Sequence, residues 1–188
     1  MRIISGKLKG SALYMPKGKY TRPLKDLARE SIFNLLVHSK KISFKLENSN
    51  ILDLYAGTGS FGLECLSRKA KLVYFIENEK SAFRILEKNI EKLKIKNKTK
   101  IFFNNVFSLI KKNILLPKFD IIFCDPPFKD KNIDELIELI LKNNLLKENG
   151  IIILHRNKTI DEKLPNYFSI LDKRVYGVSK IVFGKLLS

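Results

Sequence analysis

Hydrophobic and polar positions follow two alternating patterns along most of this 188-residue chain. Short, nearly continuous apolar runs, such as 51–54 and 121–124, are separated by longer stretches in which apolar residues recur every three or four positions. The short runs are typical of strands buried on both faces of a parallel sheet, and the longer stretches are typical of amphipathic helices. The pattern therefore predicts an α/β domain whose mostly parallel sheet is covered by helices on both sides.

From residue 50 onward, the pattern predicts a definite order of elements. The predicted strands are 51–55, 71–76, 100–103, 119–124 and 150–154, and the predicted helices are 60–69, 79–94, 106–112 and 132–145. Two late segments, 168–175 and 179–186, are joined through Gly177 and predict an antiparallel hairpin. We therefore expect a Rossmann-like fold with a seven-stranded, mostly parallel sheet that ends in an antiparallel C-terminal hairpin.

The first 48 residues differ from the rest in pattern and in charge. Residues 1–20 predict a short β-hairpin with a turn between Gly6 and Gly10, and the apolar spacing after Pro23 predicts an amphipathic helix. The formal charge is +17; residues 1–48 hold 11 Lys and Arg against 3 Asp and Glu, and the other 140 hold 25 against 16. We therefore expect residues 1–48 to be a basic arm that contacts a polyanion, and residues 49–188 to be the main domain.

Apolar run length and cysteine placement narrow the class of protein. No apolar run reaches the roughly 18 residues that a membrane span requires, and the N-terminus lacks a signal-peptide stretch. Cys65 and Cys124 fall inside predicted core elements without metal-ligand spacing. We expect both to be reduced packing residues in a cytoplasmic, monomeric protein that has no metal site and no membrane contact.

A glycine-rich segment follows the first predicted strand. Residues 57–62 read Gly-Thr-Gly-Ser-Phe-Gly, and such glycines let the backbone turn sharply and approach a ligand closely. In a dinucleotide site this loop meets a pyrophosphate, but Asp53 lies four residues before Gly57 and would repel phosphate. S-adenosylmethionine carries an ammonium group and a sulfonium and has no phosphate. The segment therefore favours S-adenosylmethionine, held in a loop that Asp53, Gly57 and Gly59 shape. The alternative is that Asp53 only caps the strand end.

Other polar residues stand where the later strands end. Glu77 closes the second strand, where a carboxylate in nucleotide-binding folds accepts hydrogen bonds from ribose hydroxyls; the alternative is a solvated acid at a helix start. Asn105 follows the third strand and either caps the next helix or binds the adenine amine. The remaining positions expected to line the cofactor site adjoin these residues in the sequence: Tyr55, Ala56, Asn78 and Val106.

The sharpest motif is Asp125-Pro126-Pro127-Phe128, which follows an apolar strand. A nitrogen attached to an aromatic ring is a poor nucleophile because its lone pair is delocalised into the ring. Asp125 and the carbonyl of Pro126 can accept the two N–H bonds of such an amine and favour its attacking geometry. The two prolines make the turn rigid, and Phe128 offers a face for ring stacking. The motif therefore predicts the catalytic site of an amino-methyltransferase.

The opening of the chain resembles the start of the RsmD family. The similar segments are Arg2-Ile-Ile-Ser-Gly-Lys-Leu-Lys-Gly10, Thr21-Arg-Pro23 and Arg29-Glu-Ser-Ile-Phe-Asn-Leu-Leu36, and the likeness continues through both motifs above. This family consists of bacterial enzymes that methylate the 2-amino group of a guanine in small-subunit ribosomal RNA. The resemblance implies a class I S-adenosylmethionine-dependent methyltransferase fold and, as partner, ribosomal RNA within an assembling small ribosomal subunit. We expect RNA contacts from Lys7, Lys9, Arg22 and Arg29.

Three other functions stay open at this point. A DNA adenine or cytosine amino-methyltransferase shares both motifs but usually carries a target-recognition insert, for which this chain has no room. A protein glutamine methyltransferase typically has Asn before Pro-Pro. A non-catalytic RNA-binding assembly factor would explain the basic arm but not the glycine loop. The family often has an acidic residue where this chain has His155; this histidine either closes the strand structurally or titrates near neutral pH.

Overall fold

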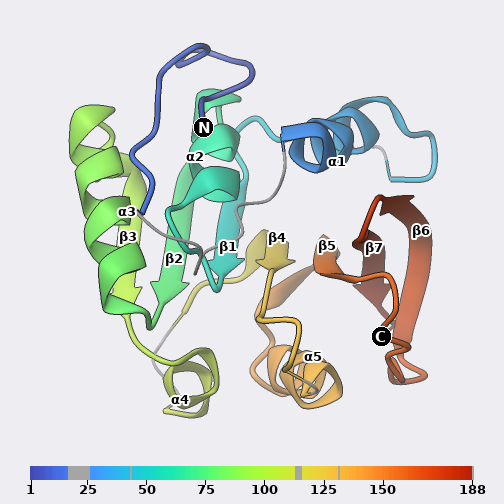
Figure 1. The fold of residues 1–188 in the computed structure, drawn as a ribbon. Helices are drawn as coiled ribbons and strands as arrows, with labels where there is room; N and C mark the ends of the chain where they lie inside the picture. The colour runs from blue at the N-terminus through green and yellow to red at the C-terminus, as the bar shows by residue number, and fades with distance from the viewer. Residues whose placement is uncertain (17–25, 43, 113–115, 131, 188) are drawn as a thin grey trace.

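A seven-stranded sheet runs through the protein in the order β3-β2-β1-β4-β5-β7-β6 (Figure 1). The computed structural model describes residues 1–16, 26–42, 44–112, 116–130 and 132–187. The strands are β1 (Asn50–Leu54), β2 (Leu72–Glu77), β3 (Thr99–Phe103), β4 (Phe119–Cys124), β5 (Leu146–Asn157), β6 (Phe168–Tyr176) and β7 (Ser179–Leu186). The helices are α1 (Asp26–His38), α2 (Ser60–Ser67), α3 (Lys80–Lys92), the 3-10 turn η1 (Lys96–Lys98), α4 (Val106–Lys111) and α5 (Ile133–Lys142).

Side chains alternate along the strands and so supply two cores, one on each face of the sheet. In β4, Ile121 and Phe123 pack with apolar residues of α1, α2 and α3, whereas Ile122 and Cys124 pack with those of α4 and α5. Figure 1 shows these two helical layers on opposite sides of the sheet. Strands β1 to β5 pair in parallel, and β7 pairs antiparallel with both β5 and β6. The predicted sheet and its C-terminal hairpin are therefore confirmed.

Strand β5 begins four residues before the predicted start at 150. Phe119 pairs with Leu146 and Ile121 pairs with Ile151, so the pairing of β4 and β5 shifts between them. Residues 147–150 form an irregular stretch of β5, and a Cβ on Gly150 would lie 2.7 Å from the side chain of Leu146. A polar Lys-Glu-Asn-Gly stretch resembles a turn in sequence, and only its pairing with β4 makes it part of a strand.

The N-terminal residues do not form a core of their own. Ile3, Leu13 and Phe33 are buried in the same cluster as the sheet residues beneath α2. The predicted hairpin appears as one antiparallel bridge between Arg2 and Ala12. The predicted helix is α1, although its expected start near Pro23 lies outside the described residues. The arm is therefore one layer of the domain wherever the structure describes it.

The structure also bears on the two cysteines and on the length of the helices. Cys65 and Cys124 are free and buried, as predicted for packing residues. Among the helices in the described ranges, none combines the length and the apolar character that crossing a bilayer requires.

Candidate active site

The two sequence motifs meet at the carboxyl edge of the sheet. Strand β1, which leads into the glycine loop, pairs in parallel with β4, which leads into the Asp-Pro-Pro-Phe segment. Leu54 is in register with Cys124, and the backbone nitrogen of Asp125 lies 3.4 Å from the carbonyl oxygen of Leu54, to which it donates. In open α/β sheets, ligands bind beyond the carboxyl ends of the strands, so the fold brings both motifs to the expected ligand edge.

The glycine loop turns sharply through left-handed backbone conformations. Gly57 has φ 57° and Gly59 has φ 84°, values that glycine adopts without steric cost. A Cβ built on Gly57 would meet nothing within 4 Å, whereas one on Gly59 would lie 2.5 Å from Leu86. A side chain at Gly59 would therefore displace the end of Leu86 in α3, whereas Gly57 has open space beside it. Tyr55 also has a positive φ, of 59°, which is uncommon for a bulky residue.

Asp53 is buried and points toward the start of α2. Its Oδ2 accepts from the backbone nitrogen of Gly62 at 3.0 Å, and the residue is 1% exposed. Burial raises the pKa of Asp53 well above its ordinary value, the Gly62 bond lowers it, and the charges of Asp125 and Glu77 raise it further. Asp53 thus fixes the glycine loop against β1. A carboxylate that is costly to ionise alone gains most from a neighbouring cation.

Glu77 uses both carboxylate oxygens to hold the backbone around the site. Its Oε2 accepts from the nitrogen of Gly57 at 2.6 Å, and its Oε1 accepts from the nitrogens of Asn78 at 2.8 Å and Glu79 at 2.7 Å. Each carboxylate oxygen has two lone pairs, so Glu77 keeps acceptor capacity for a ligand. The alternative of a freely solvated acid at a helix start is wrong, because Glu77 is only 7% exposed.

The other positions predicted for the cofactor site lie around the same edge. Asn105 caps α4, since its Oδ1 accepts from the nitrogen of Ser108 at 3.1 Å, so the capping alternative is confirmed. Val106, the first residue of α4, is buried. The hydroxyl of Tyr55 lies 3.5 Å from Oδ2 of Asp130, two residues beyond Phe128, and this contact links the glycine loop to the segment after β4. Ala56 continues the turn, with its nitrogen donating to Ile76 at 3.0 Å.

A buried asparagine that the sequence pattern did not single out connects the N-terminal segment to the glycine loop. Asn89 of α3 is 0% exposed. Its Oδ1 accepts from the nitrogen of Tyr14 at 2.7 Å, and its Nδ2 donates to the carbonyl oxygens of Tyr14 at 3.3 Å and Thr58 at 3.1 Å. Because a buried amide with partners on both ends is costly to disturb, Asn89 holds these two segments at a fixed spacing.

Glu64 and Ser67 of α2 hold the start of the chain. The carboxylate of Glu64 accepts from the nitrogens of Ile4 at 2.7 Å and Ser5 at 2.9 Å, and its charge is paired with Arg68 at 2.8 Å. Ser67 accepts from the nitrogen of Leu8 at 3.0 Å through its hydroxyl. The backbone of the family-like opening is therefore held against α2.

Asp125 belongs to a chain of three polar side chains from three strands. Its Oδ1 lies 2.8 Å from Nδ1 of His155, and Nε2 of the same ring lies 2.9 Å from Oγ of Ser179. Phe128 meets the ring of His155 edge-on, with centroids 5.9 Å apart and planes at 73°. The two side chains of the Asp125–His155 pair are 23% and 7% exposed. His155 therefore contacts the predicted catalytic segment directly, which the sequence pattern did not show.

Arg156 holds the diproline turn from its buried side. The guanidinium is 0% exposed and donates to the carbonyl oxygens of Pro127 at 3.1 Å, Pro126 at 3.4 Å and Asp130. Its charge is paired with Glu162. Pro126 is buried and Pro127 is exposed. The predicted rigidity of this turn thus comes from the two prolines and from one arginine that binds three carbonyl groups.

The residues predicted to contact RNA have different surroundings. Lys7 and Lys9 are exposed in the N-terminal turn, and the backbone nitrogen of Lys7 donates to Ser67 at 2.8 Å, at the end of α2 opposite the glycine loop. Arg22 lies outside the described residues. Arg29 is 0% exposed, and its Nη2 donates to the carbonyl of Arg2 at 2.6 Å. The prediction that Arg29 contacts phosphate is wrong for this conformation, because its side chain is buried under the N-terminal segment.

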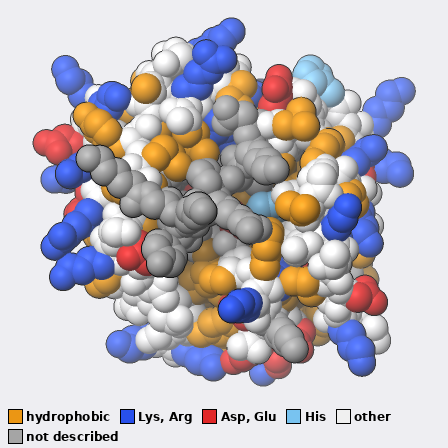
Figure 2. Space-filling view, viewed as in Figure 1, with side chains coloured by type: hydrophobic (Ala, Val, Ile, Leu, Met, Phe, Trp, Pro, Cys, Tyr) orange, Lys and Arg blue, Asp and Glu red, His pale blue; other side chains and the backbone are white. Residues whose placement is uncertain are grey.

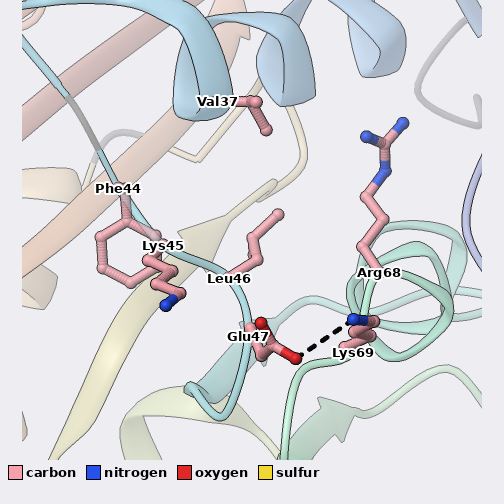
Figure 3. Close-up of a pocket in the computed structure, with 7 residues that line it drawn as sticks. All are labelled: Val37, Phe44, Lys45, Leu46, Glu47, Arg68 and Lys69. Carbon is pink, nitrogen blue, oxygen red and sulfur yellow. Dashed lines mark hydrogen bonds and ion pairs between the residues drawn. The ribbon is translucent and has the colours of Figure 1, made fainter.

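Lys and Arg side chains are spread around the rim of the face shown in Figure 2 and do not gather in one patch. A surface cavity of about 410 Å³ lies between α1, the segment before β1 and the end of α2, and an ion pair of Glu47 and Lys69 at 3.2 Å crosses its edge (Figure 3). Its lining residues are Val37, Phe44, Lys45, Leu46, Glu47, Arg68 and Lys69. None of them belongs to the carboxyl edge, so this cavity is separate from the predicted catalytic site.

Comparisons with known proteins agree over nearly the whole chain. The profile of the family described as Conserved hypothetical protein 95 matches residues 1–185. A Haemophilus influenzae protein named Ribosomal RNA small subunit methyltransferase D is 32% identical over 179 residues, which are 95% of this chain and 90% of that protein. The protein of the same name from Buchnera aphidicola subsp. Baizongia pistaciae is 36% identical over 162 residues, 86% of this chain and 79% of that one.

A solved structure supports the same grouping. It is described as a putative methyltransferase yhhF from Escherichia coli, has a TM-score of 0.84 at 26% identity, and covers 100% of this chain and 98% of its own. The strand order of the sheet and the two motifs at its carboxyl edge are thus found in a chain that matches this family from end to end. This protein belongs to the Conserved hypothetical protein 95 family, the RsmD family that its sequence resembles.

Proposed function

We propose that this protein transfers a methyl group from S-adenosylmethionine to the exocyclic 2-amino group of a guanine in small-subunit ribosomal RNA. The observation that carries the proposal is the pairing of β1 with β4, with Leu54 in register with Cys124. This pairing puts the glycine loop and Asp125 beside each other at one edge. The names of the relatives from Haemophilus and Buchnera support ribosomal RNA as the substrate class.

The residues of the edge fit a cationic cofactor without phosphate. Asp53, Glu77 and Asp125 stand at the ends of β1, β2 and β4 and are close enough for their charges to raise the pKa of Asp53. Three carboxylates favour an ammonium group and a sulfonium and disfavour a pyrophosphate. The open space at Gly57 leaves room for a ligand against the loop backbone. Glu77 would accept from ribose hydroxyls, and Asn105 would bind the adenine amine through the second lone pair of Oδ1.

Asp125 and Pro126 would orient the target amine. The cofactor supplies the methyl group on a sulfonium, which leaves as a neutral thioether when the new N–C bond forms. The carboxylate of Asp125 and the carbonyl of Pro126 would each accept a hydrogen bond from one N–H group of the amine. These bonds would turn the nitrogen lone pair toward the methyl carbon. Pro126 already accepts from Arg156 at 3.4 Å, and its second lone pair stays available. Asp125 would receive the proton that the methylated nitrogen loses.

Phe128 would hold the flipped base. Its ring is partly exposed and meets His155 edge-on, so a face is available for a guanine. A stacked base must leave its neighbours to reach this ring, which costs roughly a few kcal/mol. Unpaired or folded ribosomal RNA, or RNA in an assembling particle, presents such a base at lower cost than a duplex does. We also propose that the enzyme acts as a monomer on an assembling small ribosomal subunit.

Transfer of tritium from labelled cofactor tests the proposal. Four acceptors are compared: free small-subunit ribosomal RNA, purified small subunits, duplex DNA and total protein. We expect label in one or both of the RNA-containing samples, and a nucleoside digest should contain N2-methylguanosine. Label in DNA or protein alone would assign another class of methyltransferase. Absence of label in all four, with RNA binding retained, would favour the non-catalytic assembly factor.

A further inference from the structure

We propose that His155 is a positioning residue that fixes the carboxylate of Asp125 toward the target amine, with Ser179 fixing the ring of His155 in turn. The inference rests on the proposed function and extends it to residues outside the two sequence motifs. Asp125 follows β4, His155 lies in β5 and Ser179 begins β7, so three strands contribute to one polar chain. The fold alone brings them together, because 24 residues separate His155 from Ser179.

Each ring nitrogen of His155 has one hydrogen-bond partner. In the neutral ring, Nδ1–H donates to Oδ1 of Asp125 over 2.8 Å, and Nε2 accepts from the hydroxyl of Ser179 over 2.9 Å. The carboxylate is an acceptor only, so the ring proton must stand on Nδ1 for this contact to be favourable. Ser179 supplies the hydrogen that Nε2 needs in this tautomer. The serine thus selects the ring form that binds Asp125.

The consequence for catalysis is a fixed carboxylate. One oxygen of Asp125 is held by a side chain that is 7% exposed, whereas the aspartate side chain itself is 23% exposed. The second oxygen, Oδ2, has no hydrogen-bond partner among the residues that the structure describes, and we assign it to the substrate amine. The edge contact between Phe128 and His155 gives the stacking ring the same support. A small error in the placement of a catalytic group lowers the rate strongly, so a residue that sets this placement should affect kcat.

The competing explanation is that His155 only ties β5 to β7. Those strands are already paired by their backbones, with His155 opposite Ile181 and Asn157 opposite Ser179. The two ring nitrogens can be replaced one at a time. In His155→Asn the side-chain nitrogen takes the place of Nδ1 and keeps a donor for Asp125. In His155→Gln it takes the place of Nε2 and keeps a contact with Ser179, in which the amide nitrogen donates and the serine oxygen accepts.

Steady-state kinetics with ribosomal RNA compares these two variants with the wild type. We expect His155→Asn to keep kcat within about threefold, and His155→Gln to lose about tenfold or more, as misplaced catalytic groups do. The KM for the cofactor should stay within about twofold in both, because neither change touches the glycine loop. Melting temperature is measured for each variant, so that a loss of folded protein is corrected before kcat is compared.

A spectroscopic readout tests the pairing without the reaction. The chain has 2 histidines, and His38 is exposed, so it serves as an internal reference. In alkaline buffer, long-range proton–nitrogen spectra should show the Nδ1–H tautomer for His155 and the ordinary Nε2–H tautomer for His38. In Asp125→Ala, His155 should change to the Nε2–H form. An Nε2–H form of His155 in the wild type would overturn the proposal.

The kinetic outcomes separate this inference from the proposed function. Equal kcat in His155→Asn and His155→Gln, or a larger loss in His155→Asn, would mean that His155 acts only as a tie between strands. A wild type that transfers no methyl group to any RNA sample would refute the proposed function itself. A kcat that falls in the order wild type, His155→Asn, His155→Gln supports the positioning role.

Discussion

The backbone nitrogen of Gly57 donates to Oε2 of Glu77 across 2.6 Å, so the loop after β1 is tied to the end of β2. The other carboxylate oxygen holds the nitrogens of Asn78 and Glu79. One side chain therefore sets the shape of the glycine loop and the start of the path into α3. Glutamine has one acceptor oxygen and one NH2 group, so it can satisfy only one of these two sides.

Glu77→Gln should weaken cofactor binding by about 10- to 100-fold, the equivalent of losing one charged hydrogen bond. Calorimetric titration with S-adenosylhomocysteine measures this affinity. The matched control is Glu87→Gln, which removes the same charge from an exposed position of α3. Equal affinity of Glu77→Gln and wild type would show that the loop keeps its shape without this carboxylate.

Asp53 should release a proton when a cationic cofactor binds. Burial raises the pKa of Asp53 well above its ordinary value of 3.8 in the free protein, and a nearby cation lowers it again. Titrations in buffers of different ionisation enthalpy detect the released proton in mildly acidic solution. Asp53→Asn keeps an acceptor for Gly62 but cannot ionise, so its binding heat should not depend on the buffer.

The same residue gives a pH dependence of stability. A carboxyl group whose pKa is raised by folding stabilises the protein at low pH, and this contribution is lost as the pH rises from 3.8 toward the raised value. Relative to Asp53→Asn, the wild type should therefore lose free energy of unfolding over this range. Urea unfolding at several pH values measures the difference. A constant difference between the two proteins would contradict the raised pKa.

Gly6 and Gly10 make a matched pair for the docking of the N-terminal segment. Both have a positive φ, of 83° and 84°, but a Cβ on Gly6 would lie 2.0 Å from the carbonyl oxygen of Ser67, and one on Gly10 would meet nothing within 4 Å. Gly10→Ala should cost roughly 1 kcal/mol from backbone strain. Gly6→Ala should cost about 2 kcal/mol more, because the clash is with backbone. Similar unfolding free energies for the two variants would mean that α2 does not fix this turn.

Asp125→Ala should abolish methyl transfer and leave RNA affinity within a few fold. In the proposed function its carboxylate accepts a hydrogen bond from the amine, whereas phosphate contacts are expected from other residues such as Lys7 and Lys9. Activity is measured by label transfer, and RNA affinity is measured by filter binding at one fixed salt concentration. Asp134→Ala, an exposed change of the same charge on α5, is the control. An Asp125→Ala enzyme with full activity would remove the proposed chemistry.

The sequence by itself determined the elements and the two motifs. Apolar runs such as 121–124 set the strands, and their period of two assigned Ile122 and Phe123 to opposite faces, because neighbouring side chains on a strand point to opposite sides. Parallel strands end at the same edge, so the positions of Asp53, Glu77 and Asp125 at strand ends already predicted one shared site. These inferences need only local geometry.

The tertiary structure alone decided the partners of the buried polar groups. Asn89 binds a segment 75 residues away, His155 binds Asp125 across 30 residues, and Arg29 is buried where the sequence predicted an RNA contact. A polar residue looks the same in sequence whether it is solvated or buried with a partner. Its fate depends on which distant backbone or side-chain group the packed core brings within hydrogen-bond distance, and periodicity carries no information about that distance.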